Sequence, residues 1–253
     1  MEGDIVQDNV VVAGLNLNGH TFGVASQETS NFADPTTLFD GIMGVAQSTI
    51  SEQQTLTPVE SLAKAGLIPQ PIISFKLGRV ADGNNNGEAT LGALDTTKFD
   101  GNTLVTLKNA NPLGFWEGAI DAVSVNGADL GLNGRTAILD TGTTLLIVPQ
   151  NDAQAIHKAI PGAQDNGKGG FTVPCTTNAS LALTFSKQSF AIDPRDIAFA
   201  PVDPNDPAGQ CASGISAGNV GGADEWLAGD VFLKNVYFST NVATNEIQLA
   251  KLT

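Results

Sequence analysis

The chain has 253 residues, of which 42% are apolar and 15% are charged, a composition that supports a packed core and argues against disorder. Its formal net charge of −14 argues against nucleic acid and anionic membranes as partners, because both attract basic surfaces. No apolar run approaches the roughly 20 residues that span a bilayer, and the acidic start Met1-Glu2-Gly3-Asp4 lacks the basic region of a signal peptide.

Short apolar-alternating runs separated by Gly, Asn and Asp predict an all-β architecture. The first such pattern, residues 8–26, predicts two strands joined near Asn18-Gly19. Further strands are expected on both sides of an exposed loop at 79–87 and in two later hairpins, 118–130 and 236–252.

Two segments break the strand pattern and predict short surface helices. In TPVESLAKAGLIP (57–69), Thr57 is the expected N-cap, Pro58 opens the first turn, and Glu60 completes a capping box. The second helix is expected in PQNDAQAIHKAIPG (149–162), which places Ala153, Ile156 and Ile160 on one face.

A sharp turn, Asp140-Thr141-Gly142, interrupts two apolar runs in TAILDTGTTLLIVP (136–149). A carboxylate at the tip of such a turn is held by backbone N–H groups, and Thr141 and Thr143 can add hydrogen bonds that fix the turn. Gly142 permits a close approach of the chain. We therefore interpret Asp140 as a functional carboxylate and not as an ordinary turn residue.

The two cysteines, Cys175 and Cys211, leave a disulfide and two buried thiols both open, because the redox compartment is unknown. A bridge would stabilise the fold by ~4 kcal/mol in the loop-entropy model. Asn178-Ala179-Ser180 is a sequon, so Asn178 is a candidate glycosylation site.

The other residue types that carry chemistry are isolated. His20 and His157 belong to no cluster with metal-ligand spacing, so we expect surface histidines and no metal site. The glycine-rich DGNNNGEATLG lacks the Lys-Ser/Thr of a phosphate loop, and no cofactor is expected. Trp116 and Trp226 are expected in the core.

Four stretches, in this order and spacing, resemble the pepsin family of aspartic endopeptidases, of a fungal type: LFDGIMGVA (38–46), TPVESLAKAGLI (57–68), ILDTGTTLL (138–146) and EWLAGDVFLKNVYFSTNVATNEIQLA (225–250). The match runs from Gly3 to the C-terminus. It implies a second-lobe disulfide between Cys175 and Cys211.

The resemblance implies two β lobes with a cleft between them, each lobe giving one aspartate from a D-T/S-G turn. The two carboxylates share a proton and activate a water that attacks the scissile amide. We therefore expect an all-β, pepsin-like acid protease fold with a partial N-terminal lobe at 1–107 and a complete C-terminal lobe at 108–253. Asp140 would be one catalytic aspartate, oriented by Thr141, Gly142 and Thr143.

The chain departs from the family pattern because it holds one D-T-G and no second D-T-G or D-S-G. Asp95-Thr96-Thr97 is the nearest, and it lacks the glycine. Ile42-Met43-Gly44 matches the element that lies beside the first-lobe turn, as Leu227-Ala228-Gly229 does for the second. The single tyrosine, Tyr237, falls in the final strands. We expect a chain that begins just after the flap and lacks the front of the first lobe.

Three functions remain open. The first is a truncated aspartic-protease-like protein that lacks independent proteolytic activity and binds a peptide or protein ligand, because one carboxylate cannot divide the acid and base roles. The second is an active endopeptidase, assembled as a homodimer or with a complementary fragment that covers the open first-lobe strands. The third is a lectin-like or immunomodulatory binding protein on an inherited fold. Acidity and the resemblance favour a secreted or vacuolar location.

Overall fold

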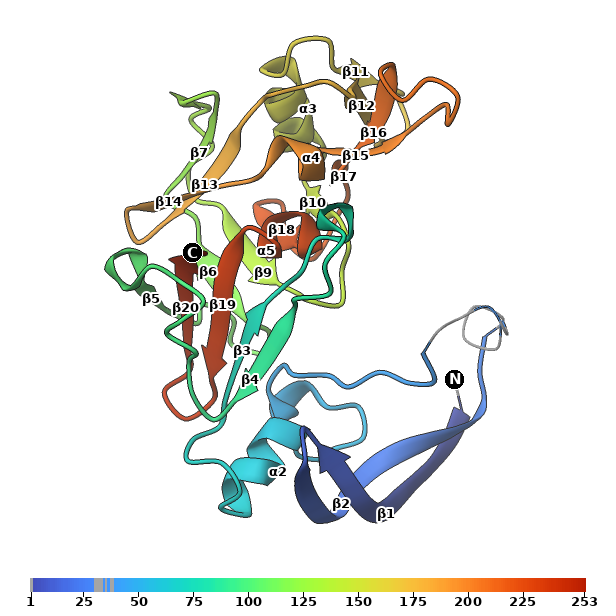
Figure 1. Cartoon of the computed structure of the whole chain (residues 1–253), viewed down its shortest axis with the longest axis vertical. Helices are drawn as coiled ribbons and strands as arrows, with labels where there is room; N and C mark the ends of the chain where they lie inside the picture. Colours follow the sequence, from blue (N-terminus) through green and yellow to red (C-terminus); the bar gives the residue numbers. More distant parts are fainter. Residues whose placement is uncertain (1, 30–33, 35, 37–38) are drawn as a thin grey trace.

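The computed structural model describes residues 2–29, 34, 36 and 39–253. Met1 and Leu38, which enter the sequence predictions, lie outside this set. Short strands form most of the regular structure, so the all-β prediction is confirmed. Figure 1 shows a lobe of small sheets at one end, a long hairpin at the other, and a shared sheet between them.

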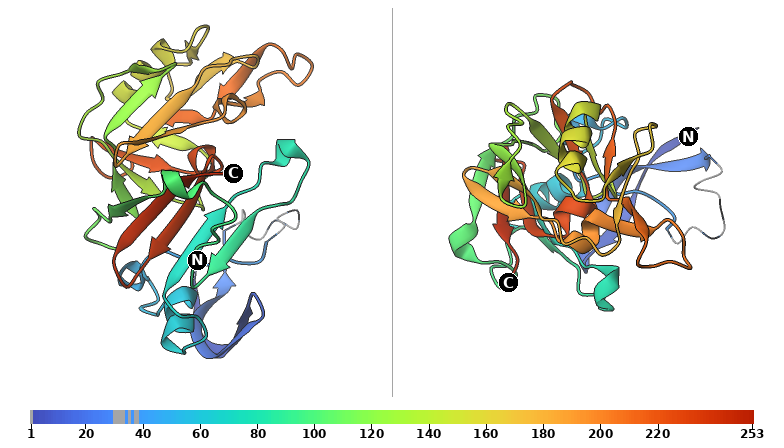
Figure 2. Two further views of the ribbon diagram at one scale, coloured as in Figure 1. Left: turned by 60° about the vertical axis from the view of Figure 1, so that its left-hand side comes forward. Right: turned by 90° about the horizontal axis from the view of Figure 1, so that it is seen from above.

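The hairpin consists of β1 (Glu2–Val12) and β2 (Leu15–Gln27) and projects from the body of the molecule (Figure 2). Its turn is Ala13-Gly14, and both residues have positive φ, 48° and 80°. The prediction of a turn near Asn18-Gly19 is therefore wrong. A two-residue turn with both φ angles positive matches the twist of paired strands, and it forms here five residues earlier. Most of the hairpin is exposed.

The shared sheet has the strand order β4-β3-β19-β20-β5, and all neighbours in it are antiparallel. It joins early strands to the last two strands of the chain, with Phe75 of β3 opposite Phe238 of β19. The expected boundary between residues 107 and 108 lies between the last two residues of β5, within the shared sheet. The division into lobes stays a prediction. The strands are β3 (Ile72–Lys76), β4 (Glu88–Leu91), β5 (Val105–Lys108), β19 (Val236–Asn241) and β20 (Glu246–Lys251).

The C-terminal part contains three further sheets. The one that positions the Asp140 turn has the order β17-β10-β18-β9-β6, with β6 (Glu117–Ala119), β9 (Thr136–Leu139), β10 (Leu146–Val148), β17 (Ile215–Ala217) and β18 (Glu225–Ala228). A second contains β7 (Ala122–Val125), β8 (Ala128–Asp129), β13 (Leu181–Phe185) and β14 (Gln188–Ala191). The third contains β11 (Gln164–Asp165), β12 (Phe171–Pro174), β15 (Ala198–Pro201) and β16 (Gln210–Ser213).

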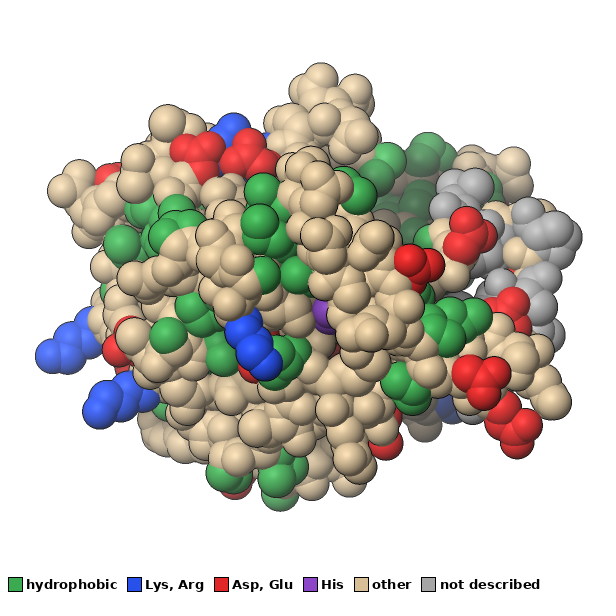
Figure 3. Space-filling view, turned by 90° about the horizontal axis from the view of Figure 1, so that it is seen from below, with side chains coloured by type: hydrophobic (Ala, Val, Ile, Leu, Met, Phe, Trp, Pro, Cys, Tyr) green, Lys and Arg blue, Asp and Glu red, His purple; other side chains and the backbone are tan. Residues whose placement is uncertain are grey.

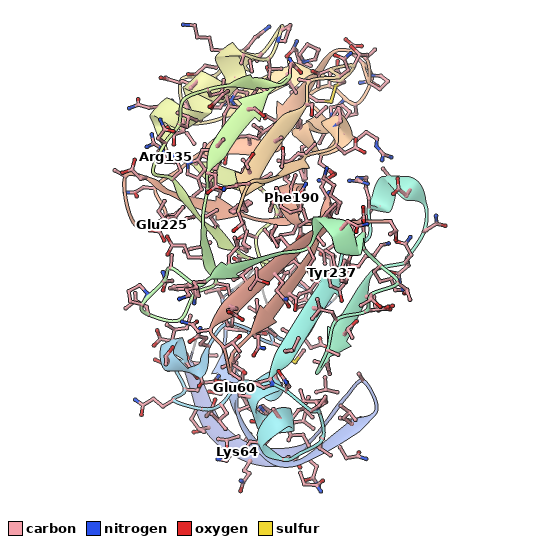
Figure 4. The ribbon with its side chains drawn as sticks, turned by 90° about the vertical axis from the view of Figure 1, so that its left-hand side faces the viewer. Glu60, Lys64, Arg135, Phe190, Glu225 and Tyr237 are labelled. Carbon is pink, nitrogen blue, oxygen red and sulfur yellow. A yellow bond between two sulfur atoms is a disulfide. The ribbon has the colours of Figure 1, made fainter. Side chains whose placement is uncertain are left out.

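Both predicted helices are present. α2 (Pro58–Lys64) has Thr57 as N-cap with the complete capping box to Glu60, and it lies at the hairpin end of the molecule (Figure 4). α3 (Gln150–Lys158) buries Ala153 and Ile156. The described residues also form α4 (Pro194–Ile197) and α5 (Asp230–Leu233), which were not predicted. At four residues each, they are too short for an apolar period to show. Short 3-10 turns are η1 (Ser48–Ile50), η2 (Val80–Asp82) and η3 (Gly101–Thr103).

The large core lies in the C-terminal part, and Trp116 and Trp226 are buried in it, as predicted. A smaller cluster under the hairpin contains Leu17, Val59, Leu62, Ile68 and Ile73. The C-terminal part therefore buries much more apolar surface than the hairpin end. The stability of the hairpin end depends on few buried contacts.

Both histidines are buried, so the prediction of surface histidines is wrong. His157 lies in α3 with Nδ1 2.7 Å from the Ala153 carbonyl oxygen and Nε2 2.8 Å from Ser213 Oγ, and its ring stacks on Phe171. Burial lowers the pKa of His157, so the neutral ring is favoured. His20 faces α2 across a hollow that Ser61 and Lys64 also line.

A polar cluster ties the 79–82 segment to the C-terminal part. The Arg79 guanidinium donates to both carboxylate oxygens of Asp196, which is 2% exposed. Lys234 Nζ lies 2.9 Å from Asp196 Oδ1. Such bidentate pairing fixes the relative position of the two elements.

Among the described residues no helix is long and apolar enough to cross a membrane.

Cys175 and Cys211 form a disulfide, as the resemblance implied. It joins the end of β12 to β16, across a sequence separation of 36. We expect the double substitution Cys175→Ala/Cys211→Ala to lower the free energy of unfolding by about 2–4 kcal/mol, because the unfolded chain gains conformational entropy. Urea unfolding of the oxidised chain and of the variant measures this. Equal stabilities would contradict it.

Candidate active site

The Asp140 turn connects β9 to β10, and both strands flank β18 in one sheet. The Asp140 N–H donates to the Ala228 carbonyl oxygen at 3.1 Å, which anchors the turn to β18. The Gly142 N–H donates to Asp140 Oδ1 at 2.8 Å, and the Thr143 hydroxyl donates to Oδ2 at 2.6 Å. Both carboxylate oxygens are thus held in place, and the half-buried side chain faces a cavity.

The three residues expected to orient Asp140 act differently. Gly142 and Thr143 bond to it directly. Thr141 lines the cavity beside Asp140, and in the described part of the chain its hydroxyl forms no bond to the carboxylate.

Gly229 follows the last residue of β18 and precedes α5, and it allows the Asp140 turn to pack closely against this segment. A Cβ at this position would overlap the Thr143 carbonyl oxygen and lie 2.6 Å from that of Leu145. The Gly229 N–H donates to the Leu145 carbonyl oxygen at 3.1 Å. The Leu227-Ala228-Gly229 element therefore lies beside the Asp140 turn, as the internal repeat suggested.

The cavity beside Asp140 has a volume of about 720 Å³ and walls that are mainly apolar. One wall contains Leu113, Phe115 and Trp116, and another contains Ile42 and Met43. Leu113 is 63% exposed and Ile42 75% exposed, so large apolar side chains face solvent here. Apolar surface of this extent commonly marks a binding site.

Asn111 shapes the first wall. Its Oδ1 accepts the backbone N–H groups of Leu113, Gly114 and Phe115 at 3.0–3.3 Å. Its Nδ2 donates to Glu117 Oε2 at 2.8 Å. This network holds the 111–115 loop in one conformation. The Trp116 indole N–H donates to the Val45 carbonyl oxygen, which connects the two walls.

Ile42-Met43-Gly44 also faces this space, and nothing lies within 4 Å of a Cβ built on Gly44. The equivalent position in the second half, Gly229, is crowded by the Asp140 turn. The two matching elements thus differ in what packs against their glycine. The Asp140 turn packs against Gly229, whereas none of the described residues packs against the corresponding face of Gly44. Asp95 is no substitute, since its Oδ1 accepts from Thr97 in a local turn and its N–H donates to the Tyr237 hydroxyl.

Two further carboxylates lie near Asp140. Glu225, labelled in Figure 4, lines the cavity. Its Oε2 accepts the Gly222 N–H at 2.9 Å. Asp230 is absent from the lining; its N–H donates to the Thr143 carbonyl oxygen, and its Oδ1 is buried without a hydrogen-bond partner among the described residues. Burial is the largest cause that raises the pKa of Asp230 to about 6; Asp140 acts in the same direction, and Lys234 opposes both.

A sequence model of the family described as "Eukaryotic aspartyl protease" matches residues 1–252. This chain belongs to the eukaryotic aspartyl proteases. It is 37% identical over 251 residues to rhizopuspepsin from Rhizopus chinensis, covering 98% of this chain and 60% of that protein. It is 36% identical over 240 residues to aspartic-type endopeptidase ctsD from Aspergillus fumigatus, covering 94% of this chain and 48% of that protein.

This aspartyl protease chain thus spans about half to three-fifths of the length of the curated relatives it matches. The pepsin-like fold expected from the sequence is confirmed. The catalytic roles of Asp140, Thr141, Gly142 and Thr143 stay predictions.

The sequence interpretation of this aspartyl protease chain missed several residues around Asp140. Asn111 came from a loop without a motif, whereas Glu225 opens β18 and stands in the stretch 225–250 that carried the resemblance. The roles of both depend on contacts that only the folded chain creates. Asp230 stands in the stretch LAGD that carried the resemblance, directly after Gly229. A carboxylate placed between two apolar runs was a signal that could have drawn attention to it.

Asp230 is expected to make this aspartyl protease chain less stable as the pH rises. The unfolded carboxyl ionises near its ordinary pKa of 3.8, whereas the folded one keeps its proton up to about pH 6. Stability therefore falls between these values. We expect the ionisation of Asp230 to lower the free energy of unfolding of the unchanged chain by about 1–3 kcal/mol between pH 3.5 and pH 7. Asp230→Asn should lack this loss, and urea unfolding at the two pH values measures it.

Asp193→Asn is the matched control for this measurement. A hydrogen bond from Arg195 lowers the pKa of Asp193, so its ionised form stabilises the fold and its contribution is lost as the pH falls. The two variants should shift the pH dependence in opposite directions. If Asp230→Asn and the unchanged chain have parallel stability profiles, Asp230 does not act in this way.

Proposed function

We propose that this chain carries one catalytic half of an aspartic endopeptidase, and that alone it binds peptide segments beside Asp140 without cleaving them. The observation that carries the proposal is the Asp140 turn, whose carboxylate oxygens are fixed by Gly142 and Thr143 at the edge of an apolar cavity. A fixed carboxylate beside a large binding surface suits general acid–base work on a bound polymer.

Hydrolysis of an amide by this chemistry needs two facing carboxyl groups in opposite protonation states. The sequence supplies one D-T-G turn. Glu225 is the other acid among the described lining residues. Its Oε2 accepts the Gly222 N–H, and it stands at the start of β18, whereas Asp140 follows the end of β9. The proposal is therefore that independent cleavage is absent, since removal of one member of a catalytic unit costs several orders of magnitude in rate.

The cavity also indicates the chemistry of its ligand. Apolar walls at Leu113, Phe115 and Ile42 suit the side chains of an extended peptide, and Asp140 and Glu225 suit neutral or basic groups. Figure 3 shows acidic side chains gathered at the hairpin side of one face, consistent with the net charge of −14. An acidic protein repels polyanions and tolerates neutral or basic peptides.

A complementary polypeptide that restores the second carboxylate is the second candidate, and the open environment of Gly44 favours it. The exposed side chains of Ile42 and Met43 would be covered by such a segment. A homodimer through two Asp140 residues is less favoured, because the 42–46 segment of each copy borders the space that a second copy needs. The lectin-like alternative has no supporting contact among the described residues.

Binding of an apolar heptapeptide, measured by isothermal titration calorimetry at mildly acid pH, tests the proposal. We expect saturable binding, and intact peptide by mass spectrometry afterwards. Phe115→Ala should weaken binding about tenfold, because a ring that lines the cavity is lost. Phe199→Ala is the matched control: Phe199 is 44% exposed and Phe115 40%, and Phe199 lies on β15, outside the lining.

Two results would count against the proposal. One is the absence of measurable binding by the folded chain. The other is peptide cleavage that disappears in Asp140→Asn, which would show that the chain is an independent enzyme.

A further inference from the structure

We infer that Asn178 is a site of N-linked glycosylation. Asn178-Ala179-Ser180 is the single Asn-X-Ser/Thr tripeptide in the 253 residues, and its middle residue is not proline. The motif alone is weak, because such tripeptides arise by chance. Its position in the fold and a neighbouring covalent bond provide the stronger argument.

Asn178 lies in the exposed loop between β12 and β13. In the described structure its side chain forms no hydrogen bond. The flanking residues are well anchored: Ala179 is buried, and its N–H donates to Thr177 Oγ1 at 3.2 Å. The Ser180 N–H donates to Asn126 Oδ1 at 3.0 Å. A glycan on Asn178 would therefore displace no internal contact, while the loop that carries it stays fixed.

The same loop begins at Cys175, which is bonded to Cys211. Disulfides form and persist in oxidising compartments, and the secretory pathway is the eukaryotic compartment in which sequons are also modified. The disulfide and the sequon are independent features of the sequence, and both indicate the same compartment. The free side chain of Asn178 and the disulfide at Cys175 are therefore both compatible with folding in that compartment.

The glycan would leave the proposed binding site open. The residues that line the cavity come from 42–142 and from 220–240, and none comes from the 175–180 loop. The modification and the binding of peptides can therefore be tested separately, and failure of one leaves the other intact.

The reaction joins Asn178 Nδ2 to C1 of the first sugar of a lipid-linked oligosaccharide pyrophosphate. One C–N bond forms, the C–O bond to the pyrophosphate breaks, and the amide nitrogen loses one proton. The lipid pyrophosphate leaves with the bonding electron pair, so no oxidant or reductant is needed.

Secretion of the full chain from a glycosylating yeast, behind a cleavable leader, tests the inference. Intact mass and gel mobility are compared before and after endoglycosidase treatment. We expect one glycan on the unchanged chain and on Ser180→Thr, which keeps the sequon. Asn178→Gln and Ser180→Ala should lose it. Cell lysates are measured with the medium, so that a variant retained in the cell is still scored.

Two outcomes would overturn the inference. The first is a secreted, disulfide-bonded chain with the mass of the unmodified polypeptide. The second is a glycan that persists in both Asn178→Gln and Ser180→Ala, which would place it on another residue.

Discussion

Gly229→Ala is expected to abolish the turn that holds Asp140 and to lower the free energy of unfolding by at least about 4 kcal/mol. The added Cβ would overlap the backbone oxygen of Thr143 and crowd that of Leu145, so no side-chain rotation can relieve it. The Gly229 and Asp140 backbone bonds to neighbouring strands would be lost together. Urea unfolding monitored by circular dichroism measures the loss.

Gly44→Ala is the matched control, because Gly44 is the equivalent glycine in the first half of the internal repeat. No atom lies within 4 Å of a Cβ at this position, and its φ lies outside the range that L residues avoid. We expect a change of less than about 1 kcal/mol. Similar losses in the two variants would show that crowding by the Asp140 turn is not what requires glycine at position 229.

The second large effect concerns activity. We expect proteolysis at acid pH to appear when this chain is mixed with a polypeptide that carries the first-lobe D-T-G turn and flap of a fungal relative. Asp140→Asn should then reduce the rate at least about a thousandfold, because an amide cannot take the acid or base role of a carboxyl group. Rates of casein cleavage with and without the added polypeptide measure this.

Gly44→Ala also serves as the control for assembly. If a first-lobe turn packs on Gly44 as the Asp140 turn packs on Gly229, a Cβ there should prevent the gain of activity while leaving the chain itself folded. Full activity of the mixed Asp140→Asn variant would exclude Asp140 from catalysis. Full activity of the mixed Gly44→Ala variant would exclude the docking geometry.

Local features of the fold could be predicted because their causes are local. The capping box of α2 uses Thr57 and Glu60, three residues apart, and the Asp140 turn is closed by bonds to Gly142 and Thr143. The burial of Trp116 and Trp226 follows from their size and apolar character. These elements needed no knowledge of distant strands.

Features that depend on distant residues could not be predicted. His157 has a polar ring near the end of α3, but Ser213 and Phe171 from other strands enclose it. The first turn forms at Ala13-Gly14, although Asn18-Gly19 is the dipeptide that such a turn prefers, so local turn preference did not decide its position. The raised pKa of Asp230 arises from burial and from Asp140, which lies 90 positions earlier in the chain.

We propose that one chain supplies one catalytic carboxylate and is inactive alone. A casein-cleavage assay across acid to neutral pH tests this, on a sample whose mass is measured in the same solution by light scattering. We expect no cleavage by the folded monomer at any pH in this range. Cleavage by the monomer that Asp140→Asn abolishes would contradict it.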